Sequence, residues 1–156
     1  NEVQPHRARL VAAAVGDAAE VVVGDGTRPP WPPGGFDRVM VDAPCTGLGA
    51  LRRRPESRWR RSPADVDRLG PLQRALLGAA LDSARPGGLV AYVTCSPHLA
   101  ETRTVVADVL RERPGVTQLD ARPALPEMPG LGEGPDVQLW PHRHGTDAMY
   151  LALLRP

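Results

Sequence analysis

Lysine is absent from this sequence of 156 residues, and all 19 basic residues are arginine. Because alanine, glycine and proline are also abundant, we attribute this absence to coding bias, which weakens any argument from the number of arginines alone. The net charge is only +1. The overall charge therefore does not identify a nucleic-acid-binding protein, and the distribution of charge along the chain matters more.

Long apolar runs are absent too, which argues against a membrane-spanning helix. The longest runs, residues 10–15 and 89–93, fall far short of the roughly 20 residues that span a bilayer. Residues 1–20 lack the features of a secretory signal, so we expect a cytoplasmic protein in a reducing compartment. Two cysteines cannot build a disulfide framework. A composition of 42% apolar and 24% charged residues predicts one ordinary globular domain.

The pattern of apolar residues and of helix-breaking residues predicts alternating strands and helices. The expected helices cover residues 6–15, 63–85 and 99–111, and the expected strands cover residues 20–23, 36–41, 89–94 and 148–154. Gly70 and Pro71 are expected to kink or split the second helix. Residues 122–145 are rich in proline and glycine and show no sustained period, so we expect a long loop there with one short helical turn. This order favours an open α/β sheet with helices on both faces.

The two cysteines follow the ends of two predicted strands. Cys45 comes just after the strand that ends before Asp42, and Cys95 comes directly after strand 89–94. Functional sites of open parallel sheets lie beyond the carboxyl ends of the strands, and paired strands are about 4.8 Å apart, so both thiols would face one crevice. Position alone equally allows two small buried hydrophobic residues. A thiol redox pair is disfavoured, because there is no Cys-X-X-Cys arrangement.

The residues around the cysteines carry a family resemblance. The strings DAPCTGLGALRRRPESRW at 42–59 and YVTCS at 92–96 together resemble the Sun-type RNA 5-methylcytosine methyltransferases, which include bacterial ribosomal small-subunit RNA methyltransferase B. Further matches are GDGT at 24–27 and PHRHGTD at 141–147. The resemblance implies a Rossmann-like class I methyltransferase sheet with strand order 3-2-1-4-5-7-6. It also implies S-adenosylmethionine as cofactor and RNA as substrate, with rRNA favoured over tRNA.

The resemblance further implies that Cys95 is the nucleophile and that Cys45 resolves the covalent intermediate. Carbon 5 of cytosine is too weak a nucleophile to take a methyl group unaided, and thiolate addition at carbon 6 activates it. Cys95 therefore needs a lowered pKa, which we expect from the dipole of the following helix and from nearby arginine. Asp42 is the candidate acid near nitrogen 3 of the ring. The alternative role for Asp42 is a cap at the strand end.

Three acidic residues are candidates for binding the cofactor. Asp25 resembles the family's acidic residue near the adenine, although a simple Asx turn would have the same sequence. Glu2 is placed to meet the ribose hydroxyls, and Asp42 lies at the next strand end. The family's glycine-rich cofactor loop has no counterpart here. We therefore expect residues 1–156 to form the C-terminal portion of a methyltransferase domain that lacks its first strands and exposes a strand edge.

A basic segment is the candidate RNA-binding site. It has one glutamate and six arginines, a local charge of +5, and its arginines are Arg52, Arg53, Arg54, Arg58, Arg60 and Arg61. Phosphate contacts together with stacking on Trp59 would suit such a loop, whereas the alternative is a solvated basic loop anchored by the tryptophan. His142 and His144 lack a third nearby ligand, so no metal site is expected. The alternative function is a truncated, non-catalytic RNA-binding fragment.

Overall fold

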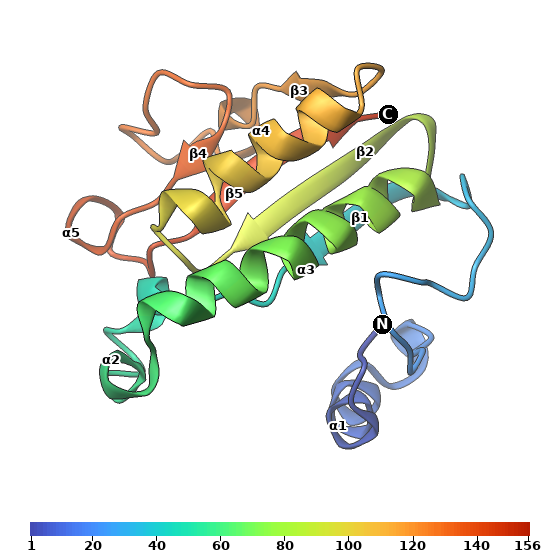
Figure 1. Ribbon diagram of the computed structural model, residues 1–156, viewed down its shortest axis with the longest axis horizontal. Helices are drawn as coiled ribbons and strands as arrows, with labels where there is room; N and C mark the ends of the chain where they lie inside the picture. The colour runs from blue at the N-terminus through green and yellow to red at the C-terminus, as the bar shows by residue number, and fades with distance from the viewer.

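The computed structural model describes residues 1–156, and a five-stranded mixed sheet forms its centre (Figure 1). The strand order is β1-β2-β5-β3, and the short β4 also pairs with β5. Strands β1 and β2 are parallel, whereas β5 runs antiparallel to β2, β3 and β4. The strands are β1 (Phe36–Asp42), β2 (Ala84–Thr94), β3 (Thr117–Leu119), β4 (Val137–Gln138) and β5 (Tyr150–Arg155). The predicted open α/β sheet is confirmed.

The order β1-β2-β5-β3 matches the 4-5-7-6 half of the strand order that the family resemblance implies. The other predicted strand, residues 20–23, is reduced to a single parallel bridge between Glu2 and Val23, with the Glu2 amide donating to the Val22 carbonyl at 3.0 Å. As a strand this prediction is wrong, because the segment pairs with one neighbour at only one point. The bridge nevertheless joins residues 20–23 to residues 1–3, and strands 3 and 2 are neighbours in the strand order that the family resemblance implies.

Two long helices cover one face of the sheet, where Figure 1 shows them side by side. Helix α3 (Pro63–Ser83) begins as predicted after Ser62, whose amide donates to the Asp65 carboxylate at 2.9 Å. Helix α4 (Arg103–Glu112) follows a 3₁₀ turn at Leu99–Glu101, so the α-helix starts later than predicted. Both helices bury apolar residues against alternate residues of β2 and β5. The core comprises Val41, Ala43, Leu77, Ala80, Leu81, Ala84, Val90, Tyr92, Val105, Val106, Val109, Tyr150, Ala152 and Leu154.

Helix α3 is not split at Gly70 and Pro71, contrary to one of the two outcomes expected there. Proline removes one backbone hydrogen bond from a helix. The turns that follow Pro71 bury Leu77 and Leu81 against the sheet, and this packing offsets the lost bond. Strand β2 also starts earlier than predicted, at Ala84, because Ala84 already pairs with Phe36 of β1; residues 85–88 form an irregular stretch, and regular pairing resumes at Leu89 opposite Arg38.

Helix α1 (Pro5–Val15) lies away from the sheet, beyond the unpaired edge of β1 (Figure 1). Leu10 on this helix and Met40 on β1 are 69% and 73% exposed. The expected exposed strand edge is therefore present at β1. The remaining short elements are 3₁₀ turns at Gly16–Ala18, Leu48–Ala50 and Arg122–Ala124, and single-turn helices α2 (Ser57–Arg60) and α5 (Pro141–His144). None of the helices has the length and apolar character needed to cross a membrane.

Candidate active site

The two cysteines meet beyond the carboxyl ends of β1 and β2. These strands pair in parallel with Asp42 opposite Val93, so the loops that follow them leave the sheet at the same edge. The Cys45 and Cys95 Sγ atoms are 3.4 Å apart, within hydrogen-bonding distance for sulfur, and both side chains are half-buried. The structure thus brings together the two residues that the sequence placed at neighbouring strand ends.

The pKa values of the two thiols are shifted in opposite directions. A hydrogen bond from Cys45 lowers the pKa of Cys95 to about 7, against the opposing effects of burial and of the nearby Asp42 charge. The same contact, followed by burial, raises the pKa of Cys45. These opposite shifts make Cys95 the thiol that ionises first and Cys45 the thiol that donates the hydrogen bond between them.

The expected lowering of the Cys95 pKa is present, but its main cause differs from the predicted one. Helix α4 begins at Arg103, eight residues beyond Cys95, and a helix dipole acts only over the first turn. The hydrogen bond from Cys45 is the largest effect instead. Arginine is nonetheless close: Asp147, and more weakly the Cys95 thiolate, raise the pKa of Arg53.

Three backbone segments pack closely behind the cysteines. The Gly49 amide donates to the Cys95 carbonyl at 2.9 Å, and the Ala148 amide donates to the Gly49 carbonyl at 2.9 Å. A side chain at position 49 would overlap both neighbours, since its Cβ atom would lie 2.1 Å from the Ala148 carbonyl oxygen. Glycine is therefore required where the Cys45 loop, the Cys95 loop and the residues before β5 converge.

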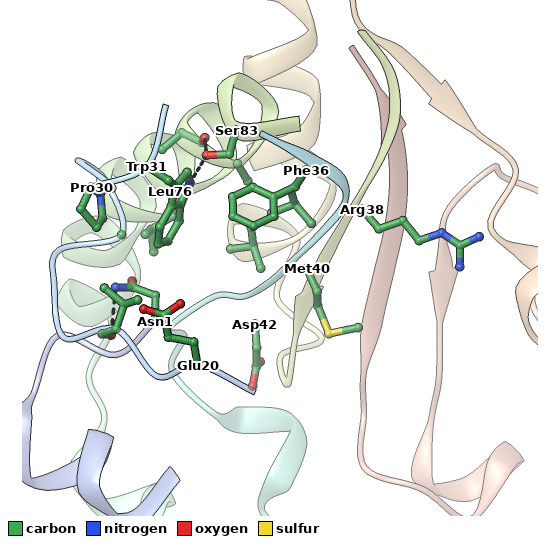
Figure 2. Close-up of a pocket in the computed structure, with 16 residues that line it drawn as sticks. Asn1, Glu20, Pro30, Trp31, Phe36, Arg38, Met40, Asp42, Leu76 and Ser83 are labelled. Atoms are coloured by element: carbon green, nitrogen blue, oxygen red, sulfur yellow. Dashed lines mark hydrogen bonds between the residues drawn. The ribbon is translucent and has the colours of Figure 1, made fainter. Parts of the chain in front are cut away.

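A cleft of about 650 Å³ lies beside the unpaired edge of β1, within the roughly 300–1,000 Å³ range of small-molecule sites. Its lining includes Trp31 and Phe36, which contact each other edge-to-face with ring centroids 5.5 Å apart, and the carboxylates of Glu20 and Asp42 (Figure 2). The Trp31 indole donates to the Ser83 hydroxyl at 2.9 Å. Asp42 belongs both to this cleft and to the surroundings of Cys95, and so connects the two.

Two of the predicted cofactor-binding residues do not line this cleft, although their neighbours Asn1 and Gly26 do. Glu2 forms an ion pair with Arg7 at 3.3 Å. Asp25 accepts bonds from the amide and hydroxyl of Thr27 at 2.9 and 2.8 Å, the Asx turn that the sequence left open, and these bonds lower its pKa. Their roles as cofactor ligands remain predictions.

Glu20 lines the cleft and was not singled out in the sequence. The signal that could have identified it is its position immediately before the apolar run 21–23.

The six arginines of the basic segment fall into two groups. Arg52 and Arg53 form ion pairs with the buried carboxylate of Asp147, with the Arg53 Nε atom 2.8 Å from it, while their own side chains are 47% and 62% exposed. The side chains of Arg54, Arg58, Arg60 and Arg61 form no ion pair, and Trp59 is 84% exposed. The tryptophan therefore does not anchor the loop by packing. These four unpaired arginines form an exposed basic surface around an uncovered aromatic ring.

The histidine segment is held by its own backbone contacts. The His144 Nδ1 atom accepts from the Trp140 amide at 2.8 Å, and its Nε2 atom lies 3.1 Å from the Pro129 carbonyl. No group of three or more potential ligands forms a metal site. Asp147 instead forms an ion pair with Arg53. The residues before β5 therefore hold the segment that follows the Cys45 loop.

Comparison with known proteins gives consistent results. A family model described as 16S rRNA methyltransferase RsmB/F matches residues 1–155. Rv1407 of Mycobacterium tuberculosis strain H37Rv, assigned as a methyltransferase, is 64% identical over 99% of this chain and 34% of its own length. Ribosomal RNA small subunit methyltransferase B of Pectobacterium carotovorum is 36% identical over 87% of this chain and 30% of its own length. The chain thus spans about a third of these curated relatives.

Two solved structures share the fold. The crystal structure of PH0851 superposes with a TM-score of 0.90 and 31% identity, over 99% of this chain and 36% of that chain. NSun6 from Pyrococcus horikoshii, solved with SFG, superposes with a TM-score of 0.75 and 25% identity, over 98% of this chain and 39% of that chain.

Proposed function

This chain belongs to the 16S rRNA methyltransferase RsmB/F family, and from that membership we propose that it forms the cysteine-bearing part of an S-adenosylmethionine-dependent RNA methyltransferase. The proposed reaction is methylation of carbon 5 of cytosine through a covalent bond between Cys95 and carbon 6. The observation that carries the proposal is the 3.4 Å contact between the Cys95 thiol, whose pKa is lowered, and the Cys45 thiol, whose pKa is raised. Ribosomal RNA is the proposed substrate class because curated relatives carry it in their names.

Cys95 begins the reaction as the nucleophile. With its pKa lowered to about 7, a large fraction of this thiol is ionised at neutral pH, and the thiolate is the form that attacks. Its sulfur forms a bond to carbon 6, and the electron pair of the 5,6 double bond moves toward the ring nitrogen. Asp42, at the end of β1, is the proposed group that holds a proton at nitrogen 3. Carbon 5 then has the electron density to take a methyl group.

Cys45 completes the reaction by removing the proton from carbon 5. The hydrogen bond to Cys95 is the main cause of the raised pKa of Cys45. Once Cys95 is bonded to carbon 6, its sulfur no longer carries that negative charge, so Cys45 gives up its proton to water more easily. The ionised Cys45 accepts the carbon-5 proton, the 5,6 double bond re-forms, Asp42 takes back the proton from nitrogen 3, and the Cys95 thiolate leaves. Cys45 is then protonated and Cys95 ionised, as they were at the start.

The end of the cleft beside Asp42 is the part that suits S-adenosylmethionine, because it lies at the carboxyl end of β1. There the carboxylates of Glu20 and Asp42 offer acceptors for hydroxyl and ammonium groups. Trp31 and Phe36 lie toward the other end of β1, along the edge where the family strand order places another strand. When bound, this cofactor supplies an electrophilic methyl group. Asp42 lines the cleft and its charge acts on Cys95, so the reacting thiol lies nearest to this end of the cleft. The NSun6 structure, which contains the S-adenosylmethionine analogue SFG, supports the same cofactor class.

The exposed basic surface is the proposed RNA contact. Its free arginines can bind phosphates, and Trp59 can stack on an unpaired base. The segment continues directly from the Cys45 loop, and the ion pairs of Arg52 and Arg53 fix it to Asp147 near the thiols. RNA bound there would be held next to Cys95.

Trapping of a covalent complex tests the proposal. The complete protein carrying Cys45→Ala is incubated with RNA and S-adenosylmethionine, and denaturing electrophoresis separates free from covalently bound RNA. We expect the adduct to accumulate, because Cys95 can still add while the later proton removal is slowed. Cys95→Ala is expected to form no adduct, and the double variant serves as the matched control.

The assignment of roles fails if Cys95→Ala forms the adduct. The covalent mechanism fails if Cys45→Ala binds RNA and cofactor but forms none.

A further inference from the structure

Directly behind the two thiols lies the fully buried carboxylate of Glu101. The Thr46 amide donates to one of its oxygens at 2.8 Å, and the Thr46 hydroxyl donates to the other at 2.6 Å. The Ser96 hydroxyl donates at 2.6 Å, and the Gln73 side-chain amide at 3.3 Å. Four donors from three parts of the chain therefore meet on one acidic group.

Burying a carboxylate in this way is unfavourable for the stability of the fold. Moving a charged carboxylate out of water costs several kcal/mol unless partners compensate, and no arginine forms an ion pair with Glu101. Neutral hydrogen-bond donors supply all of the compensation. Because well-packed apolar residues often stabilise a core as well as buried charges do, the carboxylate is better explained by the geometry that it imposes than by stability alone.

The donors identify that geometry. Thr46 directly follows Cys45, and Ser96 directly follows Cys95. Each of the two cysteine loops is thus tied to the same carboxylate one residue after its thiol, and the two thiols lie 3.4 Å apart. A change in the position of this carboxylate would move both loops.

Glu101 is itself held rigidly. The buried Tyr92 hydroxyl donates to its backbone carbonyl at 2.9 Å. Gln73 of α3, which donates to the carboxylate, also donates to the Pro44 carbonyl at 2.9 Å. The carboxylate is therefore connected to β2 and to α3, and it can act as a fixed point for the loops.

We propose that Glu101 is a positioning residue that sets the separation of the Cys45 and Cys95 thiols by holding Thr46 and Ser96 on one carboxylate. This rests on the proposed function for its catalytic meaning, although the geometry can be measured without it. Glu101 touches neither thiol and is not a catalytic residue. The hydrogen bond to Cys95, burial and the charge of Cys95 are the larger causes of the raised pKa of Cys45, and the negative charge of Glu101 adds the smallest contribution in the same direction.

Cross-linking with dibromobimane tests the proposal, because this reagent becomes fluorescent when two thiolates have each displaced one of its bromides. The complete protein is used with Cys45 and Cys95 as its only cysteines. Glu101→Gln keeps the size of the side chain but replaces an acceptor oxygen by a donor group, which opposes the hydroxyls of Thr46 and Ser96. We expect its rate of cross-linking to fall at least tenfold, while the wild type reacts rapidly and Cys45→Ala gives no fluorescence.

Two further variants keep the test decisive if Glu101→Gln fails to fold. Thr46→Val and Ser96→Ala each remove one hydroxyl donor and leave the carboxylate with its other partners. Each is expected to slow cross-linking by a smaller factor, and the double variant is expected to approach Glu101→Gln. Glu112→Gln, at the end of α4, is the matched control for loss of a carboxylate and should react like the wild type. Wild-type rates in folded Glu101→Gln, or in the folded double variant, would overturn the proposal.

The outcome is separable from that of the proposed function, because cross-linking requires neither RNA nor cofactor. If Cys45→Ala forms no RNA adduct but the cross-linking rates behave as expected, the positioning role stands and the reaction is wrong. For an active enzyme, Glu101→Gln should lower kcat at least tenfold and leave the KM for RNA unchanged. A merely structural role would not change thiol separation and kcat together at unchanged thermal stability.

Discussion

Replacing Gly49 by alanine is expected to force apart the three backbone segments that meet behind the cysteines. The added Cβ atom would lie 2.1 Å from the Ala148 carbonyl oxygen and 2.7 Å from the Cys95 carbonyl oxygen. Both oxygens belong to the backbone, so no side chain can rotate to make room. The same residue also makes one backbone hydrogen bond to each of these segments.

The size of the effect follows from these contacts. Forcing an extra methyl group into a packed region costs about 1–3 kcal/mol, and each of the two disturbed hydrogen bonds adds about 1 kcal/mol. The free energy of unfolding should therefore fall by roughly 3–5 kcal/mol, a large part of the roughly 5–15 kcal/mol that stabilises a typical protein.

Urea unfolding of the complete protein measures this loss. Gly47→Ala is the matched control in the same turn: no atom lies within 4 Å of its added Cβ atom, but the residue has a φ of 72°. Alanine in that left-handed conformation costs about 1–2 kcal/mol. The reasoning is refuted if Gly49→Ala destabilises the protein no more than Gly47→Ala does.

Two further predictions concern the thiols and the RNA surface. Alkylation of Cys95 by iodoacetamide should increase with pH through a midpoint near 7, its lowered pKa, because only the thiolate reacts. Cys45→Ala should move that midpoint upward by removing the stabilising hydrogen bond, and an unchanged midpoint would contradict the stated cause. Trp59→Ala should weaken RNA binding about 5- to 150-fold, the equivalent of ~1–3 kcal/mol of base stacking. Filter binding at several salt concentrations should show an unchanged salt dependence, since the indole is uncharged, and a reduced slope would argue against stacking.

The meeting of the cysteines was predictable from the sequence because it depends on local patterns. The strands that precede Cys45 and Cys95 are marked by apolar runs and end at polar or turn-forming residues. Once two such strands are neighbours in a parallel sheet, the rule that loops gather at their carboxyl ends places the thiols together.

The groups that support the site were not predictable, because their partners lie far away in the sequence. Glu101 meets Thr46 across 55 residues, and Arg53 meets Asp147 across 94. No periodicity or local motif links such pairs. For the same reason the cause of the Cys95 pKa was misjudged: the effective neighbour is a thiol 50 residues away rather than the helix that follows.

The position of β5 has a consequence for how the protein is made. This strand comes after every other strand in the chain, yet it lies between β2 and β3 in the sheet. The amide of Ala148, two residues before β5, also donates to the Gly49 carbonyl beside the thiols. During synthesis on the ribosome, the edge of β2 that pairs with β5 stays unpaired until β5 has been synthesised. An intermediate with an exposed strand edge favours aggregation. The thiol pair thus gains its final support in the last stage of translation of these residues, so an incomplete nascent chain cannot present a finished site.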